Sequence, residues 1–147
     1  MKYEEILEHL APCGIDCYRC VAYKDGPVGQ MASRLKDALT GFERMAAIRS
    51  DNIPVLKHYS EFIEILDFLA QGECRGCRKG SACVPFCAAK DCFKEKNVDF
   101  CFQCEEYPCS RNSYPQNLAK RWAAYNDRMK EVGVENFYEE QSKKPRY

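Results

Sequence analysis

Apolar residues recur every three or four positions in several stretches of the chain, and this spacing predicts amphipathic helices. In the clearest stretch, Leu118, Trp122 and Tyr125 share one helical face, and Gly133 ends the pattern. Helices are predicted over residues 3–10, 28–49, 55–70, 116–132 and 134–142. No stretch alternates between apolar and polar residues over the length of a strand. The sequence therefore predicts a mainly α fold.

The two central helices are expected to pack as an antiparallel pair. Only a short break that contains Pro54 separates them, and short connections place neighbouring helices antiparallel. Gly41 weakens the first of the two helices by up to about 1 kcal/mol. We expect a single domain, residues 1–147. Its helical body comprises residues 28–70 and 116–142, and its metal-binding segments are residues 13–20 and 74–109.

Residues 74–109 contain eight of the eleven cysteines and few apolar side chains. Ordering a backbone costs roughly 1–2 kcal/mol per residue, and so few apolar residues do not offset that cost. Thiolates that bind a metal ion stabilise segments of this kind, because the free energy of metal binding adds to that of folding. We therefore expect an irregular segment that metal ions hold together.

The spacing of the cysteines supports this interpretation. Two residues between a pair of cysteines let both sulfurs bind one metal at about 2.3 Å, while backbone amides donate to the thiolates. Three such C-x2-C pairs occur, at positions 17/20, 74/77 and 101/104. Disulfides are rare in a reducing compartment, and an odd number of cysteines cannot pair completely within the chain. The candidate metal ligands are Cys13, Cys17, Cys20, Cys74, Cys77, Cys83, Cys87, Cys92, Cys101, Cys104 and Cys109.

The central cysteines can be grouped into sites in more than one way. Grouping by neighbours along the chain gives two sets of four, Cys74, Cys77, Cys83 and Cys87, and Cys92, Cys101, Cys104 and Cys109. A cross-braced arrangement that exchanges Cys87 or Cys92 between the sets fits the spacing about as well. Cys83 and Cys92 are the cysteines that we most readily expect not to bind metal, because neither belongs to a C-x2-C pair.

The N-terminal set of Cys13, Cys17 and Cys20 is one ligand short of a tetrahedron. A cysteine from the central segment, His9, Asp16 or water can complete it. Of these, water leaves an open site at which catalysis is conceivable. We favour a surface position for His9, which lies on an acidic helix.

Zinc and iron–sulfur clusters both bind four thiolates, and zinc is the expected metal. Many bacterial ferredoxin motifs end in Cys-Pro, whereas here a proline precedes Cys109. We predict two or more structural zinc ions in a binding or regulatory module. The first alternative is an iron–sulfur or redox-sensing protein, and the second is an enzyme with an open metal site at Cys13, Cys17 and Cys20. No catalytic residues and no site for an organic cofactor can be assigned, which favours a protein without enzymatic activity.

The charged residues are balanced, with 22 basic and 22 acidic side chains. Residues 1–72 carry 8 basic and 11 acidic side chains, and residues 73–147 carry 14 basic and 11 acidic ones. The net charges of the two halves, −3 and +3, therefore differ only mildly. Nucleic-acid-binding proteins usually show a basic excess, which argues against a nucleic-acid partner. No apolar run approaches the ~18 residues of a membrane span. We expect a cytoplasmic protein with no membrane partner, and a protein partner is left open.

Three basic residues, Arg75, Arg78 and Lys79, surround the first central cysteine pair. Cations close to a thiol stabilise its thiolate form, and we prefer this role to the binding of an anion. Trp122 and Tyr125 lie at core spacing, so both are interpreted as packing residues.

Three segments together resemble a known family. They are APCGIDCYRCVAY near the N-terminus, CRGC in the middle and CAAKDCFKEKNVDFCFQCEEYPC after it. The ordered series CGxxCxxCxAY, CxGC and FCxxCxxYPC, over most of residues 10–110, resembles the family catalogued as domain of unknown function 3795. Its members are small, prokaryotic, cysteine-rich proteins that are regarded as zinc-binding. The resemblance therefore implies metal binding, and it implies no activity.

Overall fold

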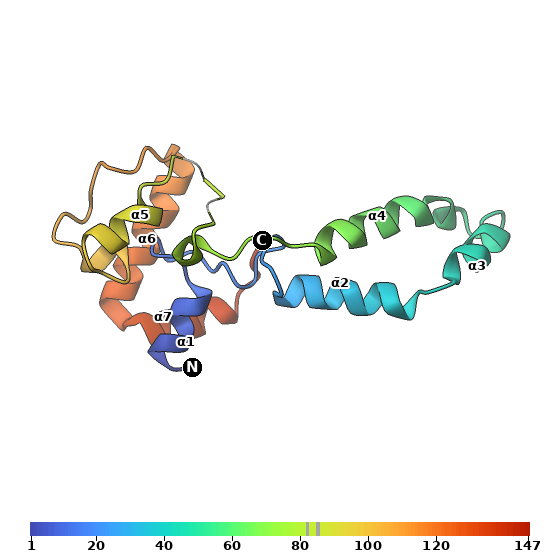
Figure 1. Cartoon of the computed structure of the whole chain (residues 1–147), viewed down its shortest axis with the longest axis horizontal. Coiled ribbons are helices and arrows are strands. Elements are labelled where there is room, and N and C mark those ends of the chain that lie inside the picture. The colour runs from blue at the N-terminus through green and yellow to red at the C-terminus, as the bar shows by residue number, and fades with distance from the viewer. Residues whose placement is uncertain (82, 85) are drawn as a thin grey trace. The chain divides into compact units, whose positions relative to one another are not determined.

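The computed structural model describes residues 1–81, 83–84 and 86–147. Within these residues it contains seven α-helices, three short 3-10 helices and no strand, which confirms the predicted mainly α fold (Figure 1). The α-helices are α1 Tyr3–His9, α2 Pro27–Ala38, α3 Phe42–Arg49, α4 Tyr59–Ala70, α5 Ala89–Glu95, α6 Gln116–Val132 and α7 Val134–Ser142. The 3-10 helices are η1 Pro54–His58, η2 Cys77–Lys79 and η3 Cys101–Gln103.

The chain divides into two compact units. The cysteine unit comprises Met1–Arg19 and Cys74–Tyr147, and the hairpin unit comprises Cys20–Glu73. Each unit has helices that pack on one another, and the single domain expected from the sequence stays a prediction. Among the described residues, no helix combines the length and the apolar character that a membrane span needs.

The hairpin unit consists of α2 and α4, which lie antiparallel and side by side, with α3 and η1 between them in the chain (Figure 1). Gly29 permits a close approach, because a Cβ atom at this position would lie 3.3 Å from the carbonyl oxygen of Leu69. Ala32 and Leu66 are buried, and Lys36 forms an ion pair with Asp67 across the pair. The predicted antiparallel pair is confirmed.

The prediction of one continuous helix over residues 28–49 is wrong. α2 ends at Ala38, and α3 begins at Phe42 after a turn at Gly41. Gly41 has a φ of 82°, a left-handed conformation that interrupts a right-handed helix and that glycine adopts without steric cost. The turn brings Phe42 to the ring of Tyr59, with the centroids 5.3 Å apart. The helix predicted over residues 55–70 also begins differently, since residues 54–58 form η1.

The cysteine unit has a core where α1, α6 and α7 meet. α6 and α7 agree with the predicted ranges, and Gly133, with a φ of 84°, separates them. The buried side chains of this core are Ile6, Leu10, Phe100, Met129, Val134 and Phe137. A second apolar cluster surrounds Trp122 and includes several of the cysteines.

Residues 74–109 are largely irregular where the structure describes them, but they also contain α5, which the sequence analysis missed. The side-chain oxygen of Asn112 accepts hydrogen bonds from the backbone N–H groups of Ala88 and Ala89, at 2.8 and 3.2 Å. These donors are among those that a helix start leaves without an intrahelical partner. Because the acceptor is more than twenty residues away in the chain, the local pattern gave no sign of this helix start.

Candidate metal centre

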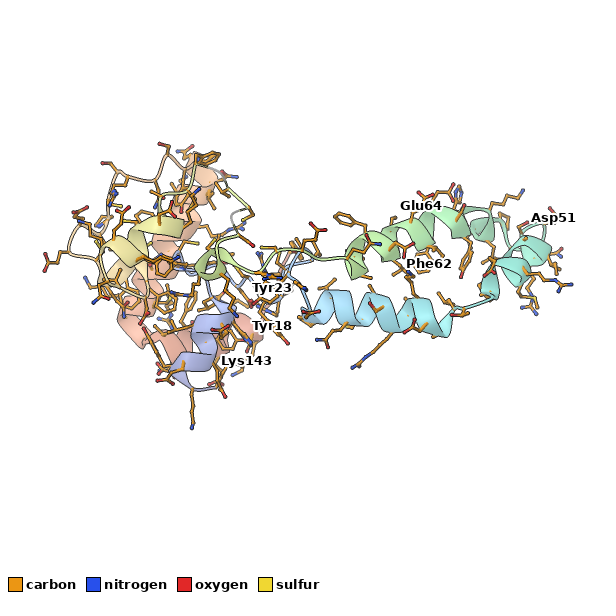
Figure 2. The ribbon with its side chains drawn as sticks, in the orientation of Figure 1. Tyr18, Tyr23, Asp51, Phe62, Glu64 and Lys143 are labelled. Carbon is orange, nitrogen blue, oxygen red and sulfur yellow. The ribbon has the colours of Figure 1, made fainter. Side chains whose placement is uncertain are left out.

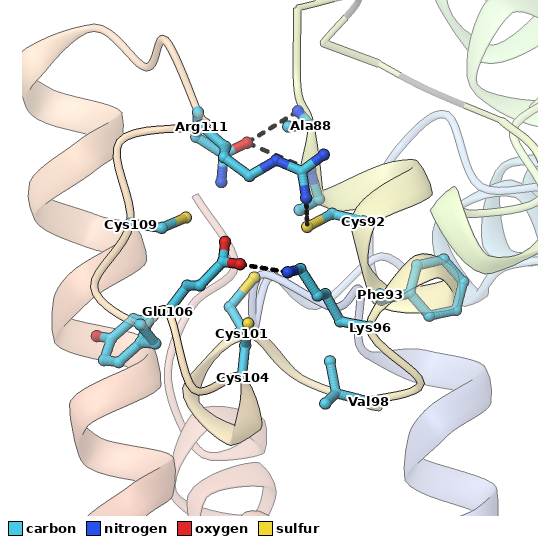
Figure 3. Close-up of a pocket in the computed structure, with 13 residues that line it drawn as sticks. Ala88, Cys92, Phe93, Lys96, Val98, Cys101, Cys104, Glu106, Cys109 and Arg111 are labelled. Carbon is cyan, nitrogen blue, oxygen red and sulfur yellow. Dashed lines mark hydrogen bonds and ion pairs between the residues drawn. The ribbon is translucent and has the colours of Figure 1, made fainter.

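Four cysteine side chains of the cysteine unit face one cavity (Figure 3). They form the thiol tetrad, defined as Cys92, Cys101, Cys104 and Cys109. α5 provides Cys92, the turn at η3 provides Cys101 and Cys104, and the segment before α6 provides Cys109. The cavity has a volume of about 20 Å³, enough for one water-sized species.

The turn that carries Cys101 and Cys104 is held by a glutamine side chain. The side-chain oxygen of Gln103 accepts hydrogen bonds from the backbone N–H groups of Asp99 and Phe100, at 2.9 and 2.8 Å. The backbone N–H of Cys104 donates to the carbonyl oxygen of Cys101 at 3.1 Å. The C-x2-C spacing thus folds into a tight turn, as expected for two ligands of one metal.

A buried asparagine on α6 fixes the position of this turn. The side-chain oxygen of Asn126 accepts a hydrogen bond from the backbone N–H of Phe102 at 3.0 Å. The sequence analysis missed Asn126. The sequence feature that could have identified it is a polar residue four positions after Trp122, on the apolar side of a strongly periodic helix.

Charged and polar side chains next to the tetrad change the pKa values of its thiols. Arg111 Nη1 donates to Cys92 Sγ at 3.1 Å, and its Nη2 lies 2.9 Å from Glu95 (Figure 3). Burial raises the pKa of Cys92, and Arg111 acts in the opposite direction. Burial raises the pKa of Cys101 to about 11, while the indole of Trp122 lowers it. The thiol of Cys101 is therefore protonated at neutral pH.

The indole of Trp122 provides a test of whether the tetrad suits a metal. Trp122 is 7% exposed and packs edge-on against Tyr107 and Tyr114, with centroids 5.1 and 6.1 Å away, which confirms its packing role. Its buried Nε1–H makes no hydrogen bond of ordinary geometry among the described residues, although it is near enough to Cys101 to lower the pKa of that thiol. A thiolate at the neighbouring Cys101 is a stronger acceptor than a thiol, and metal-bound thiolates commonly accept such bonds. The residues around the tetrad therefore fit a bound metal ion.

Five further cysteines line a second cavity of the cysteine unit, which has a volume of about 40 Å³ and an apolar wall. They form the thiol pentad, defined as Cys13, Cys17, Cys77, Cys83 and Cys87. The pentad joins two N-terminal cysteines with three from the central segment, whereas Cys20, the third member of the predicted N-terminal set, does not line this cavity. Cys87 Sγ lies 2.8 Å from the hydroxyl oxygen of Tyr114. Cys83 and Cys92, the two cysteines that the spacing marked as the readiest non-ligands, both line a thiol cavity.

Within the pentad, the thiol of Cys17 shares a hydrogen bond with Cys77. This bond lowers the pKa of Cys77 to about 7, with burial opposing it and Arg78 adding to it. The same bond and burial raise the pKa of Cys17. The predicted electrostatic role therefore agrees with the position of Arg78, whose guanidinium donates to the carbonyl oxygens of Leu10 and Asp99 at 3.0 and 2.6 Å.

The remaining candidates lie apart from the two cavities. Cys74 Sγ accepts a hydrogen bond from the backbone N–H of Gly76 at 3.4 Å, and Cys20 begins the hairpin unit. Nδ1 of His9 lies 2.5 Å from the hydroxyl of Tyr138. Both carboxylate oxygens of Asp16 accept hydrogen bonds, at 3.1 Å from the backbone N–H and 2.6 Å from Nε of Arg19. His9 and Asp16 thus already have polar partners.

As the side chains stand, no three histidine, cysteine, aspartate or glutamate residues in the described part of the chain are close enough together to hold a metal ion. All eleven cysteines are thiols rather than disulfides. The structure thus gathers nine of them around two cavities without bringing them to ligand distance. The assignment of individual ligands stays a prediction.

Comparison with known proteins gives one match. A family model with the description "Protein of unknown function (DUF3795)" matches residues 9–114, which is most of the chain. No curated protein and no solved structure is similar enough to count as a match.

Proposed function

The chain belongs to the DUF3795 family of proteins of unknown function, and we propose that it is a metal-binding protein whose thiol tetrad holds a structural zinc ion. The observation that carries the proposal is the position of four thiols, from three separate elements, around a cavity that fits one water-sized species. Partly buried thiols gathered in this way are costly to ionise without a cation, and zinc is a cation that four thiolates bind strongly.

In this proposal Cys92, Cys101, Cys104 and Cys109 hold the metal, and their neighbours stabilise the thiolate charge. Arg111 already donates to Cys92, and the indole N–H of Trp122 becomes the partner of an ionised Cys101. Zinc, when bound, supplies four bonds of about 2.3 Å to sulfur, so the thiols must come closer together than they stand now. The metal would thereby connect α5, the η3 turn and the segment before α6.

The thiol pentad is the proposed second site, which brings the number of zinc ions to two. Four of its five cysteines suffice for a tetrahedral site, and Cys13 and Cys87 are the two buried ones. A metal there would tie the N-terminal segment to the central one. Two closed structural sites leave no open metal position for substrate, so we propose a binding or regulatory role rather than catalysis.

Paired substitutions test the grouping of the ligands. We would purify the full chain anaerobically and measure zinc and iron per chain for Cys101→Ser/Cys104→Ser, Cys92→Ser/Cys109→Ser and Cys13→Ser/Cys87→Ser. The first two variants should each lose the same single metal ion, although their substitutions lie in different elements. The third should lose the other ion and keep the tetrad's ion, so it serves as the matched control.

The outcomes separate the alternatives. Loss of both metals in every variant, with retained helicity, would contradict two independent sites, and a wild-type chain without metal would overturn the proposal. Brown protein that absorbs near 400 nm and contains iron would replace zinc with an iron–sulfur cluster.

The position of Cys17 and Cys77 at one cavity, with a pKa of about 7 for Cys77, favours a second candidate function, thiol–disulfide exchange. The thiolate of Cys77 would attack a small-molecule disulfide and release one thiolate. Cys17 would then displace the second sulfur, leaving a Cys17–Cys77 disulfide and two reduced thiols. Treatment of zinc-free protein with oxidised glutathione should then lower its mass by two hydrogens and block both residues. Equal oxidation of Cys92 and Cys109 would argue against a specific pair.

A further inference from the structure

Three arginine side chains from separate parts of the cysteine unit border a small cavity, which we call the arginine cavity. Arg19 belongs to the segment that follows α1, Arg121 to α6, and Arg146 to the tail after α7. Among the described residues that line this cavity, Asp16 alone is acidic. The cavity has a volume of about 20 Å³, which admits one atom the size of a water oxygen.

Arg19 is already used by the structure itself. Its Nε donates to the carboxylate of Asp16 at 2.6 Å, and this carboxylate, which is 6% exposed, balances its charge. Its two Nη groups donate to carbonyl oxygens at the end of α7, those of Gln141, Ser142 and Lys144, at 2.8, 3.4 and 2.9 Å. A helix leaves its last carbonyl groups without intrahelical partners, so Arg19 caps α7 and holds the tail beside the cavity.

The other two arginines keep donors for a ligand. Nε of Arg146 donates to the backbone carbonyl oxygen of Asp16 at 2.9 Å, which holds its guanidinium at the cavity. Its two Nη groups have no acceptor among the described residues. Arg121 makes no hydrogen bond or ion pair in the described part of the chain. The cavity therefore carries two positive charges beyond the one that Asp16 balances.

The acidic side chains near the end of α7 do not balance these charges, because they have partners of their own. Both oxygens of Glu140 pair with Arg128, at 3.0 and 2.5 Å. Glu139 pairs with Lys143 at 2.6 Å, and Lys143 follows α7 directly (Figure 2). An anion from solution is thus the species that would balance Arg121 and Arg146.

We propose that the arginine cavity binds the terminal phosphate group of a small phosphate monoester. Such a group carries close to two negative charges at neutral pH, which matches the two unbalanced guanidinium groups. Guanidinium groups bind phosphate oxygens through paired N–H donors. The cavity admits one of these oxygens, and the rest of the ligand lies outside. A phosphate diester or a carboxylate has one negative charge and would leave one arginine unbalanced.

Tyr125 adds a possible donor to this site. It lies four residues after Arg121, so the two side chains share one face of α6, and both line the cavity. Its hydroxyl has no hydrogen-bond partner among the described residues. No cysteine lines the arginine cavity, so the proposal goes beyond the metal sites and is independent of the metal that they hold.

Titration of the full, metal-loaded chain with inorganic phosphate tests the proposal. The backbone amide NMR signals of the isotope-labelled protein would be followed at about pH 7.5, where phosphate is mainly a dianion. The signals of Gly14 and Ile15, which line the cavity, should shift and saturate. Arg121→Gln/Arg146→Gln should raise the dissociation constant about tenfold or more, because it removes charged donors. Lys143→Gln removes a charge beside the tail but outside the cavity, and this control should stay within about twofold.

A wild type without saturable shifts would overturn the proposal, as would an unchanged dissociation constant in the double variant. An equal loss in Lys143→Gln would overturn it too, because it would show attraction to general positive charge. Acetate that binds as tightly as phosphate at the same ionic strength would contradict a phosphate site and indicate a carboxylate site. If the double variant disturbs the amide signals of α7, Arg121→Gln alone decides, since this side chain makes no hydrogen bond in the described part of the chain. It should raise the dissociation constant about threefold or more.

Discussion

The side-chain amide of Asn126 donates a hydrogen bond to the backbone carbonyl of Cys13, 3.1 Å away, although 113 residues separate them in the chain. The same amide accepts from the backbone N–H of Phe102, between Cys101 and Cys104. One fully buried side chain therefore connects the N-terminal cysteines with the turn of the thiol tetrad.

Replacement of Asn126 by leucine should lower the free energy of unfolding by about 3 kcal/mol, because it leaves a buried donor and a buried acceptor without partners. Urea unfolding of the metal-loaded protein measures this change. Asn136→Ala, which removes an exposed amide on α7, is the control and should change the free energy of unfolding by less than about 0.5 kcal/mol. Equal effects of the two substitutions would contradict the role given to Asn126.

Removal of the metal should loosen the cysteine unit locally. We expect chelation to deprotect the backbone amides of α5 and η3 against hydrogen exchange, since the proposed ion connects these two elements. The amides of α2 and α4 should keep most of their protection, because their contacts contain no thiol ligand. Hydrogen exchange with mass spectrometry, with and without chelator, separates the two regions. Uniform loss of protection would show that the metal acts on both units together.

Metal binding should release protons, because thiols bind metal as thiolates. Burial raises the pKa of Cys101 to about 11, so this thiol is protonated before the metal arrives. The apparent affinity should therefore fall about tenfold per pH unit of acidification for each proton released. Zinc titration in weakly buffered solution counts the protons directly. An affinity independent of pH would show that the ligands are not thiols.

The sequence predicted α6 and α7 accurately, because Gly133 and the apolar spacing around Trp122 are local signals. It failed at residues 28–49, where the apolar period continues through Gly41 while the backbone turns. Periodicity cannot distinguish a helix from two helices that a left-handed glycine joins in register.

The thiol tetrad has the same members as one of the two sets that grouping by neighbours along the chain gave. The other set does not gather around one cavity, since Cys74 does not line the second cavity. The thiol pentad was less predictable. It combines Cys13 and Cys17 with cysteines from sixty or more positions away, and only the fold brings them together. Asn126 and Asn112 escaped prediction for the same reason, because their partners are distant in sequence.

The stability of the protein should depend on the protonation of His9. Burial lowers the pKa of His9 below its ordinary value of about 6.5, while Asp16, Glu8 and Glu5 act in the opposite direction. The unfolded chain therefore binds the proton more readily. The neutral ring contributes stability above the unfolded pKa, and that contribution is lost as the pH falls through the folded pKa.

The comparison with His9→Phe isolates this effect, because phenylalanine keeps a ring against Tyr18, which stacks on His9 with centroids 3.9 Å apart. The free energy of unfolding of the wild type, minus that of the variant, should decrease from about pH 7.5 to about pH 5.5. Metal release at low pH affects both proteins and cancels in the difference. A difference that grows on acidification would show that the folded state stabilises the protonated ring.

The turn at Gly41 should respond to substitution through the backbone alone. Gly41 has a φ of 82°, and a Cβ atom built on it would meet no other atom within 4 Å. Gly41→Ala should lower the free energy of unfolding by about 1–2 kcal/mol, the cost of a left-handed residue with a Cβ atom. Gly41→Asn should cost less, because asparagine tolerates this conformation better. Thermal unfolding of both variants gives the order. An alanine variant as stable as the wild type would mean that α2 and α3 can join into one helix, so that the left-handed turn is not required.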